Sequence, residues 1–397
     1  MKKSLQSLVL TLLTLALVFL VVLRAQQKDG LAEAWQTRPA AQPEASSAPS
    51  PTPSPSPTPA PTPTPTPEPT PEFFTLSFIG DCTLTSHQKL SEQNAAHYAM
   101  RMNGDYGYPF SNTVSYFEND DFTLANLECT FSDQQMYSAQ TFYFRAPTEW
   151  AQILTYGGVN FVTTANNHMY DFGETGAQDT FNTLEYWGIP YGRDGQAQLY
   201  ITESGLTLGV YCAYRDYNPS TEAAVEAINQ LIADGAEYII CAFHWGQELF
   251  YEPTKSQIDL AHACVDAGAD VVYGSHSHCL QPIEEYNGGL ILYSMGNCSF
   301  GGNTSPTDRD TAIVQVSVKR DLDGTVSTDS YDIIPCCISS LPIGSDNGAD
   351  NDYRPTPYEE GSEEYLRTLS KLDGSYEGGN RGADYSGWYA SYGCGPQ

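Results

Sequence analysis

A proline tract divides this chain more sharply than any other feature of its sequence. Residues Ala40 to Pro71 are almost entirely Pro, Thr, Ser and Ala, and the tract ends with proline at every second position. Because proline fixes φ and has no backbone N–H, neither a helix nor a sheet can form there. The tract predicts an extended polyproline II spacer of roughly 100 Å, at about 3.1 Å per residue. A ligand for PxxP-binding domains is the competing interpretation.

An apolar run precedes this spacer. Two lysines open the chain, and the run from Leu8 to Leu23 follows them. Extended back to Leu5, the run approaches the roughly 20 residues that span a bilayer, whereas the apolar part of a cleaved signal peptide has about 7–15 residues. We therefore expect residues 1–28 to anchor the chain in the cell membrane, with a cleaved signal segment and secretion as the alternative. Residues 29–71 are then an extracellular linker, and the lysines favour a cytoplasmic N-terminus and an extracytoplasmic domain.

After the spacer, short β-rich runs alternate with helical stretches. Strands are predicted at residues 74–79, 122–127, 160–164, 206–211, 238–243, 271–273 and 290–294. Helices are predicted at residues 175–187, 221–234 and 256–267, bracketed by Ser or Thr starts and Gly stops. Two later strands, at residues 312–318 and 326–334, have no helix between them. The pattern predicts an α/β domain with a β-rich end over residues 72–344. Residues 345–397 are rich in Gly, Tyr, Asp and Glu and form a tail to which the sequence assigns no role.

The charge of the chain excludes one class of partner. The formal net charge is −30, from 48 acidic against 18 basic residues. Such a surface repels phosphate backbones, so nucleic acid is not expected as a partner. The same argument limits contact with anionic lipids to the N-terminal segment. The ten cysteines include no CxxC pair, which argues against a structural zinc site, and most are expected to be small buried hydrophobes.

Polar residues follow the predicted strands, at the strand ends where open α/β sheets gather their ligands. Asp81 follows the first predicted strand, and Asn126 and Glu128 end the second. Asn166, Asn167, His168 and Asp171 follow the third. His244 and Glu248 follow the strand at residues 238–243, and His276 and His278 follow the strand at residues 271–273. Each one alone could cap a turn or be a hydrogen-bonded structural residue. Together they make the mixed oxygen and nitrogen set that suits Mn²⁺, Fe or Zn²⁺. A carboxylate among them could bridge two ions about 3.5–4 Å apart.

This ordered series resembles the CapA/PgsA family of poly-γ-glutamate capsule synthesis, a branch of the calcineurin-like metallophosphatase superfamily. The resemblance covers the chain from about Phe74 to Phe300, and it includes the later segment Ser294 to Phe300. Six motifs in the order of the family make the resemblance specific. It implies an α/β fold, namely a metallophosphatase-like α/β/β/α sandwich of two mixed β-sheets flanked by helices, with the metal ions at the loops of one edge.

The resemblance also implies roles for individual residues. Two divalent transition metal ions would be bound, one by Asp81, Glu128 and His278 and the other by Glu128 as the bridge, Asn167, His244 and His276. His168 would be the catalytic group that protonates a leaving oxygen or stabilises a charged transition state. Apart from the resemblance, Asn126, Asn166, Asp171 and Glu248 are candidates for supporting the ligands, and capping or solvation is the alternative for Asp171 and Glu248. The superfamily begins its first motif with Asp-x-His, whereas here Asp81 is followed by Cys82 and Thr83, so one ligand of the first ion is missing.

Two classes of function fit these features. In the first, a surface-anchored protein takes part in the synthesis or export of a capsular polymer such as poly-γ-glutamate, and its partners are the anionic polymer or its synthase complex in the membrane. In the second, the protein is a metal-dependent hydrolase or phosphoesterase that acts on cell-envelope substrates, with His168 as the general acid. The sequence has no GxSxG, no P-loop and no GxGxxG after a strand, which argues against the enzyme classes that these motifs mark. Whether the protein is catalytic or accessory stays open.

Overall fold

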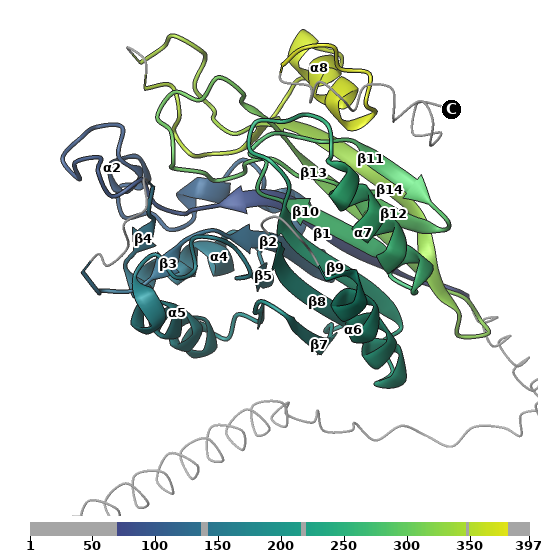
Figure 1. Cartoon of the computed structure of the whole chain (residues 1–397). Helices are drawn as coiled ribbons and strands as arrows, with labels where there is room; N and C mark the ends of the chain where they lie inside the picture. The colour runs from purple at the N-terminus through teal and green to yellow at the C-terminus, as the bar shows by residue number, and fades with distance from the viewer. Residues whose placement is uncertain (1–69, 136–141, 216–219, 347–348, 380–397) are drawn as a thin grey trace, which may run out of the picture. The chain divides into compact units, whose positions relative to one another are not determined.

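The computed structural model describes residues 70–135, 142–215, 220–346 and 349–379, and these form two large β-sheets with helices outside them (Figure 1). The expected anchor, residues 1–28, lies outside this part of the chain, and so does the linker up to residue 69. Over the described ranges, no helix is both long enough and apolar enough to cross a bilayer.

The first sheet has seven strands in the order β15-β14-β13-β1-β2-β5-β6. Its centre is β1 (Glu72–Cys82), which pairs in parallel with β2 (Phe122–Leu127). The parallel half continues with β5 (Phe161–Thr163) and β6 (Tyr191–Gly192). The antiparallel half consists of β13 (Asp310–Arg320), β14 (Val326–Cys337) and β15 (Thr356–Pro357). The sheet is therefore mixed, and its parallel strands end at one edge.

The second sheet has six strands in the order β11-β12-β10-β9-β8-β7. Four of them are parallel: β8 (Thr207–Arg215), β9 (Tyr238–Trp245), β10 (Val271–Ser275) and β12 (Gly289–Leu292). The antiparallel strands β7 (Gln196–Ile201) and β11 (Ile283–Tyr286) are the two edges. A further small sheet pairs β3 (Thr130–Phe131) with β4 (Arg145–Ala146).

The alternation of side chains along β9 explains the layers. All eight residues of β9 are buried, and neighbouring residues point to opposite faces. Ile240 and Ala242 join the core between the two sheets, whereas Cys241 and Phe243 join the core beneath the helices. Those helices are α6 (Thr221–Ala233) and α7 (Lys255–Asp266), which cover the outer face of the second sheet (Figure 1). A strand buried on both faces needs a continuous apolar run, and residues 238–243 supply it.

Helices also cover the outer face of the first sheet, and the core there contains Ile79, Ala125 and Val162 from the strands. The covering helices are α2 (Tyr98–Met102), α3 (Val114–Phe117), α4 (Gln152–Tyr156) and α5 (Gly173–Trp187), with 3-10 turns at Tyr108–Phe110 and Thr148–Ala151. Two mixed sheets between two helical layers confirm the predicted sandwich. Of the nine cysteines in the described residues, all but Cys337 are buried, which confirms that expectation too.

The helix boundaries show where capping rules succeed. Ser220 accepts a hydrogen bond from the backbone of Ala223, and Thr254 forms a capping box with Gln257, so α6 and α7 begin within a residue of their predicted starts. By contrast, α5 begins at Gly173, before the predicted residue 175, and no side chain caps it. The edge strands β7 and β11 were not predicted, because half-exposed edge strands lack a strong apolar pattern.

The segment after Gly344 adds further structure to the first sheet. Strand β15 pairs with β14, and helix α8 (Glu363–Leu372) lies against β13 and β14. Tyr353 is buried and stacks on Tyr98, with 4.9 Å between the ring centroids. The side-chain amide of Asn351 donates to the carbonyl oxygen of Phe300 at 3.0 Å. Residues 349–353 therefore hold the loop that follows β12.

Candidate metal centre

The parallel register of both sheets brings the carboxyl ends of their strands to one place. In the first sheet Asp81 pairs with Asn126, and in the second Ser275 pairs with His244. The backbone N–H of Asp81 donates to the carbonyl oxygen of Gly296 at 2.8 Å. A Cβ on Gly80 would lie 2.1 Å from that same oxygen, so only glycine allows this approach. The loop after β12 thus closes over the end of β1.

Glu128 lies at the centre of the site. Its side chain is fully buried, and neither carboxylate oxygen accepts a hydrogen bond from any described residue. Three imidazole Nε2 atoms surround the Oε1 atom, at 3.6 Å for His244 and at 3.9 Å for both His168 and His278. Burial, and then repulsion from Asp81, raises the pKa of Glu128. Because a buried acceptor normally has a partner, a carboxylate facing three ring nitrogens at these distances fits a site for cations.

Asp81 connects the two sheets. It is fully buried, its Oδ1 accepts from the side-chain amide of Asn126 at 2.8 Å, and its Oδ2 accepts from the backbone N–H of His276 at 3.2 Å. The Nδ1 atom of His278 is 3.4 Å from Oδ2 of Asp81 and 2.9 Å from Oδ1 of Asn297. Burial alone would lower the pKa of His278, but Glu128 and Asp81 outweigh it and raise the pKa to about 10.

His244 is the penultimate residue of β9 and faces the first sheet. Its Nδ1 is 2.9 Å from Oγ of Ser275 and 3.1 Å from Nδ2 of Asn126, while its Nε2 is 2.8 Å from Oδ1 of Asn167. Burial, followed by the neighbouring imidazole of His276, lowers the pKa of His244 well below its usual value. A neutral imidazole whose second nitrogen is held by neighbours is the form that binds metals.

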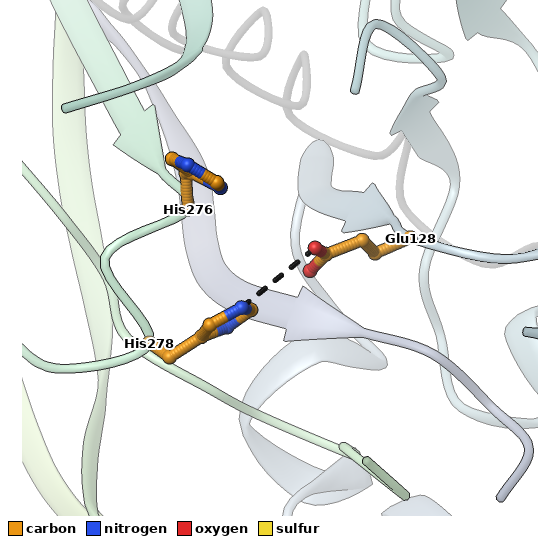
Figure 2. A group of neighbouring side chains, drawn as sticks. All are labelled: Glu128, His276 and His278. Atoms are coloured by element: carbon orange, nitrogen blue, oxygen red, sulfur yellow. Dashed lines mark ion pairs between the residues drawn. The ribbon is translucent and has the colours of Figure 1, made fainter. Parts of the chain in front are cut away.

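The two histidines of the His-x-His motif have unusual backbone conformations. The φ angle is 96° at His276 and 55° at His278, in the left-handed region that non-glycine residues rarely adopt. Figure 2 shows both imidazoles on one side of the Glu128 carboxylate, with His278 forming the marked ion pair. Such backbone strain persists where the surrounding structure requires it, and it concentrates at functional sites.

His168 is held by a buried carboxylate. Its Nδ1 is 2.8 Å from Oδ2 of Asp171, which also accepts from the backbone N–H of Phe144 at 2.9 Å. The Nε2 atom on the other side of the ring is the one that lies 3.9 Å from Glu128. Asn166 accepts from the backbone N–H of His168 at 3.1 Å. The ring is therefore fixed in place with Nε2 directed at the centre of the site.

The predicted site residues come together with one exception. Two sets of ligand atoms lie within 4.8 Å of one another, and Glu128 belongs to both: Asp81, Glu128 and His244, and Glu128, His276 and His278. The resemblance assigns Asp81 and His278 to one ion, and Asn167 and His244 to the other. The two residues of each pair are in contact in the structure. The supporting residues that make hydrogen bonds to the ligands or to His168 are Asn126, Asn166 and Asp171. Glu248 is exposed and, among the described residues, makes no hydrogen bond to an imidazole; it acts on Glu128 and His278 through its charge.

Sequence reasoning missed two partners of the imidazoles, Asn297 and Ser275. Asn297 lies in the segment Ser294 to Phe300, and its position in the resemblance was the only signal for it. The structure also shows what occupies the place of the superfamily histidine. The Thr83 hydroxyl accepts from the backbone N–H of Gly301 at 2.7 Å and donates to the carbonyl oxygen of Thr85 at 2.9 Å, so Thr83 serves the loop.

Comparison with known proteins adds a family to this geometry. Residues 75–301 match the family described as "Bacterial capsule synthesis protein PGA_cap". The chain is 28% identical over 285 residues to the "PGA biosynthesis protein CapA" of Bacillus subtilis (strain 168), covering 66% of this chain and 72% of the relative. It is 27% identical over 304 residues to the "Capsule biosynthesis protein CapA" of Bacillus anthracis, covering 69% of this chain and 70% of the relative. It is also 29% identical over 238 residues to a "Probable polyglutamine synthesis accessory protein" of Mycobacterium tuberculosis (strain CDC 1551 / Oshkosh), covering 50% of this chain and 63% of that protein.

Proposed function

Because the chain belongs to the PGA_cap family of bacterial capsule synthesis proteins, we propose that it takes part in making or exporting an anionic capsular polymer such as poly-γ-glutamate. The observation that carries the proposal is the extent of the family match, which runs from β1 to the loop after β12. That region contains every proposed ligand and His168. Two relatives are named for this role, and a third is named as an accessory protein.

The proposed centre binds two divalent transition metal ions, Mn, Fe or Zn, through Glu128 as the shared ligand. When bound, such ions supply positive charge to a buried cleft. The support for this is chemical: two carboxylates, an amide and three imidazoles converge on a volume where Glu128 has no described hydrogen-bond donor. The chain's own residues do the rest. Asn126 orients Asp81, Ser275 orients His244, and Asn297 orients His278.

We further propose that residues 1–28 anchor the protein in the cell membrane, with the domain outside the cell and residues 29–71 as the spacer. The proposed partners are then the polymer itself or its synthase complex in the same membrane. Protease added to intact cells should remove the domain and leave a short membrane-bound stub. Full-length protein recovered only from the cytosol would contradict this location.

The direct test of the metal-dependent role is Glu128→Ala in the full chain, expressed in cells that lack the wild-type copy. We expect loss of surface polymer together with loss of both metal equivalents from the purified protein, measured by elemental analysis. Glu284→Ala is the matched control, because Glu284 is also a buried glutamate but lies away from the site and bonds to His262 and Tyr293. Normal polymer levels with a metal-free Glu128→Ala protein would reject the role of the centre.

One observation favours the second function, a metal-dependent hydrolase. The Asp171–His168 pair holds Nε2 of His168 toward the centre, as a proton donor requires, and a purely structural site has no need of it. The test is His168→Ala, which should keep metal content and folding. If polymer release from isolated material then falls by about 10²–10⁴-fold, the protein is a hydrolase. If surface polymer is normal while Glu128→Ala abolishes it, the accessory role is correct.

A further inference from the structure

Beside His168 lies a group of basic and aromatic side chains that the site does not use. We call Lys89, Tyr143, Arg145 and Phe172 the basic rim. The Lys89 Nζ is 5.9 Å from the centroid of the Tyr143 ring, and the Arg145 guanidinium is 5.5 Å from that of Phe172. The Tyr143 and Phe172 rings meet edge to face at 6.2 Å. Phe172 directly follows Asp171 in sequence, so one end of the rim is tied to the residue that holds His168.

Phe144 joins the rim to the metal centre. Its buried ring lies 4.8 Å from the His168 ring and 5.8 Å from that of Phe300, which in turn lies 4.8 Å from His278. Because neighbouring side chains of an extended segment point to opposite sides, Tyr143 and Arg145 lie on the side away from that ring. Lys89 is exposed, and Tyr143 and Arg145 are half-buried. The rim is therefore separated from His168 by a single layer of side chains.

Arg145 is held differently from several other described cations. Carboxylates neutralise Arg320, through Glu72 and Glu237, and Arg367 and Lys371, through Asp310. Arg145 instead donates to the carbonyl oxygen of Gln134 at 2.6 Å and, among the described residues, forms no ion pair. A guanidinium held by an aromatic face and a carbonyl keeps its charge for another anion.

Building on the proposed function, we propose that the basic rim binds the carboxylate side chains of the anionic polymer and leads that chain to the metal centre. Arginine presents a planar fork that matches a carboxylate, lysine adds a mobile point charge, and the rings offer apolar surface to the methylene groups of the polymer. A local positive region is needed, because a protein with a net charge of −30 otherwise repels a polyanion. Arg145 also borders a cavity of about 180 Å³ together with Glu92 and Asp133, so we expect Lys89 to contribute more than Arg145.

The experiment measures binding of fluorescently labelled poly-γ-glutamate to the purified full chain by anisotropy, with Mn²⁺ present. The double variant Lys89→Ala/Arg145→Ala should weaken binding about tenfold, and the difference should shrink at high salt, as expected for exposed charges. Lys89→Glu should weaken binding further. Lys255→Ala is the control, since Lys255 is exposed on α7 and paired with Asp259, and it should leave binding unchanged. Thermal unfolding of each variant shows that it is folded, and Arg145→Gln, which also removes the charge, replaces Arg145→Ala if the latter is not.

The outcomes separate this proposal from the proposed function. If the double variant binds the polymer as tightly as the wild type while Glu128→Ala abolishes surface polymer, the rim is wrong and the function stands. If uncharged polyglutamine competes as well as poly-γ-glutamate, the rim does not act through charge and the proposal fails. If the wild type binds no polymer and Glu128→Ala leaves surface polymer unchanged, the rim and the proposed function both fail.

Discussion

Replacing Glu128 by glutamine should change stability in opposite directions with and without metal. In metal-free protein the carboxylate is fully buried, has no described hydrogen-bond donor and is repelled by Asp81. A buried charged acceptor without a partner costs more than the roughly 1–3 kcal/mol of a neutral one, and the attraction of His278 returns part of that cost. We therefore expect metal-free Glu128→Gln to be more stable than the wild type by about 1–2 kcal/mol, which is roughly 2–5 °C in Tm.

The sign of the pH dependence follows from the raised pKa of Glu128. A carboxyl group whose pKa is raised in the folded state contributes its full stability at low pH and loses it as the pH rises. Glutamine does not titrate, so the advantage of the variant should be larger at pH 8 than at pH 5. Metal reverses the order, because a ligand present at 100 times its Kd stabilises the wild type by about 2.7 kcal/mol and a variant without the shared ligand gains little.

Thermal unfolding by circular dichroism, with EDTA and then with Mn²⁺, measures both effects. The matched variant is Glu284→Gln. Glu284 is also buried, but it bonds to His262 at 3.0 Å and to the Tyr293 hydroxyl at 2.6 Å. Its replacement should destabilise the protein by about 1–3 kcal/mol whether or not metal is present. If Glu128→Gln lowers Tm in EDTA as Glu284→Gln does, then Glu128 is satisfied without metal and the reasoning fails.

Three further predictions concern other residues. Asp81→Ala should remove one metal equivalent and leave the other, whereas unchanged stoichiometry by elemental analysis would refute its role as a ligand. Asp171→Asn should keep the metal content, and any hydrolytic rate should fall by about 10–100-fold, because His168 loses the carboxylate that orients it. Burial raises the pKa of Asp270 to about 7 against about 3.9 in an unfolded chain, so the wild type should lose stability as the pH rises from 4 to 7. Asp270→Asn should remove about 1–2 kcal/mol of that loss. This is less than the whole pKa shift of Asp270 implies, because the residue is only half-buried. An unchanged pH profile of Tm in the variant would contradict this.

The fold was largely predictable because its signals are local. A strand buried on both faces needs an apolar run, and the run of β9 predicted that strand to within two residues. Strand β2, in which Thr123 and Asn126 interrupt the apolar residues, was predicted at its observed bounds. Ser220 and Thr254 cap their helices from neighbouring positions, so α6 and α7 were also predicted. The small elements α2 and β15 escaped prediction, because segments of two to five residues owe their form to packing rather than to their own sequence.

The residues of the centre were named by sequence, but their arrangement was not. Strand ends predicted that Asp81, Glu128 and His244 would meet, since parallel strands of one sheet end at one edge. Strand-end patterns alone could not say that two different sheets share that edge, which only the family resemblance implied. In the structure the loop through Gly296 closes over β1 there. Nor could the sequence show that Glu128 would face three imidazoles without a hydrogen-bond donor.

Features that depend on neighbouring residues could be predicted from the sequence, whereas features that depend on contacts between distant residues could not. Apolar periodicity, caps and the proline tract act over a few residues, so the sequence by itself determined an α/β domain after a linker and the residue types of the site, whereas the sandwich was implied by the family resemblance. Other features depend on residues that are distant in sequence. Asn297 pairs with His278, and Phe144 packs against His168. The left-handed backbone of His276 depends on the packing around it. Only the tertiary structure decided these contacts. Burial removes water from polar groups, so each buried polar group depends on the hydrogen-bond partner that the fold brings within reach.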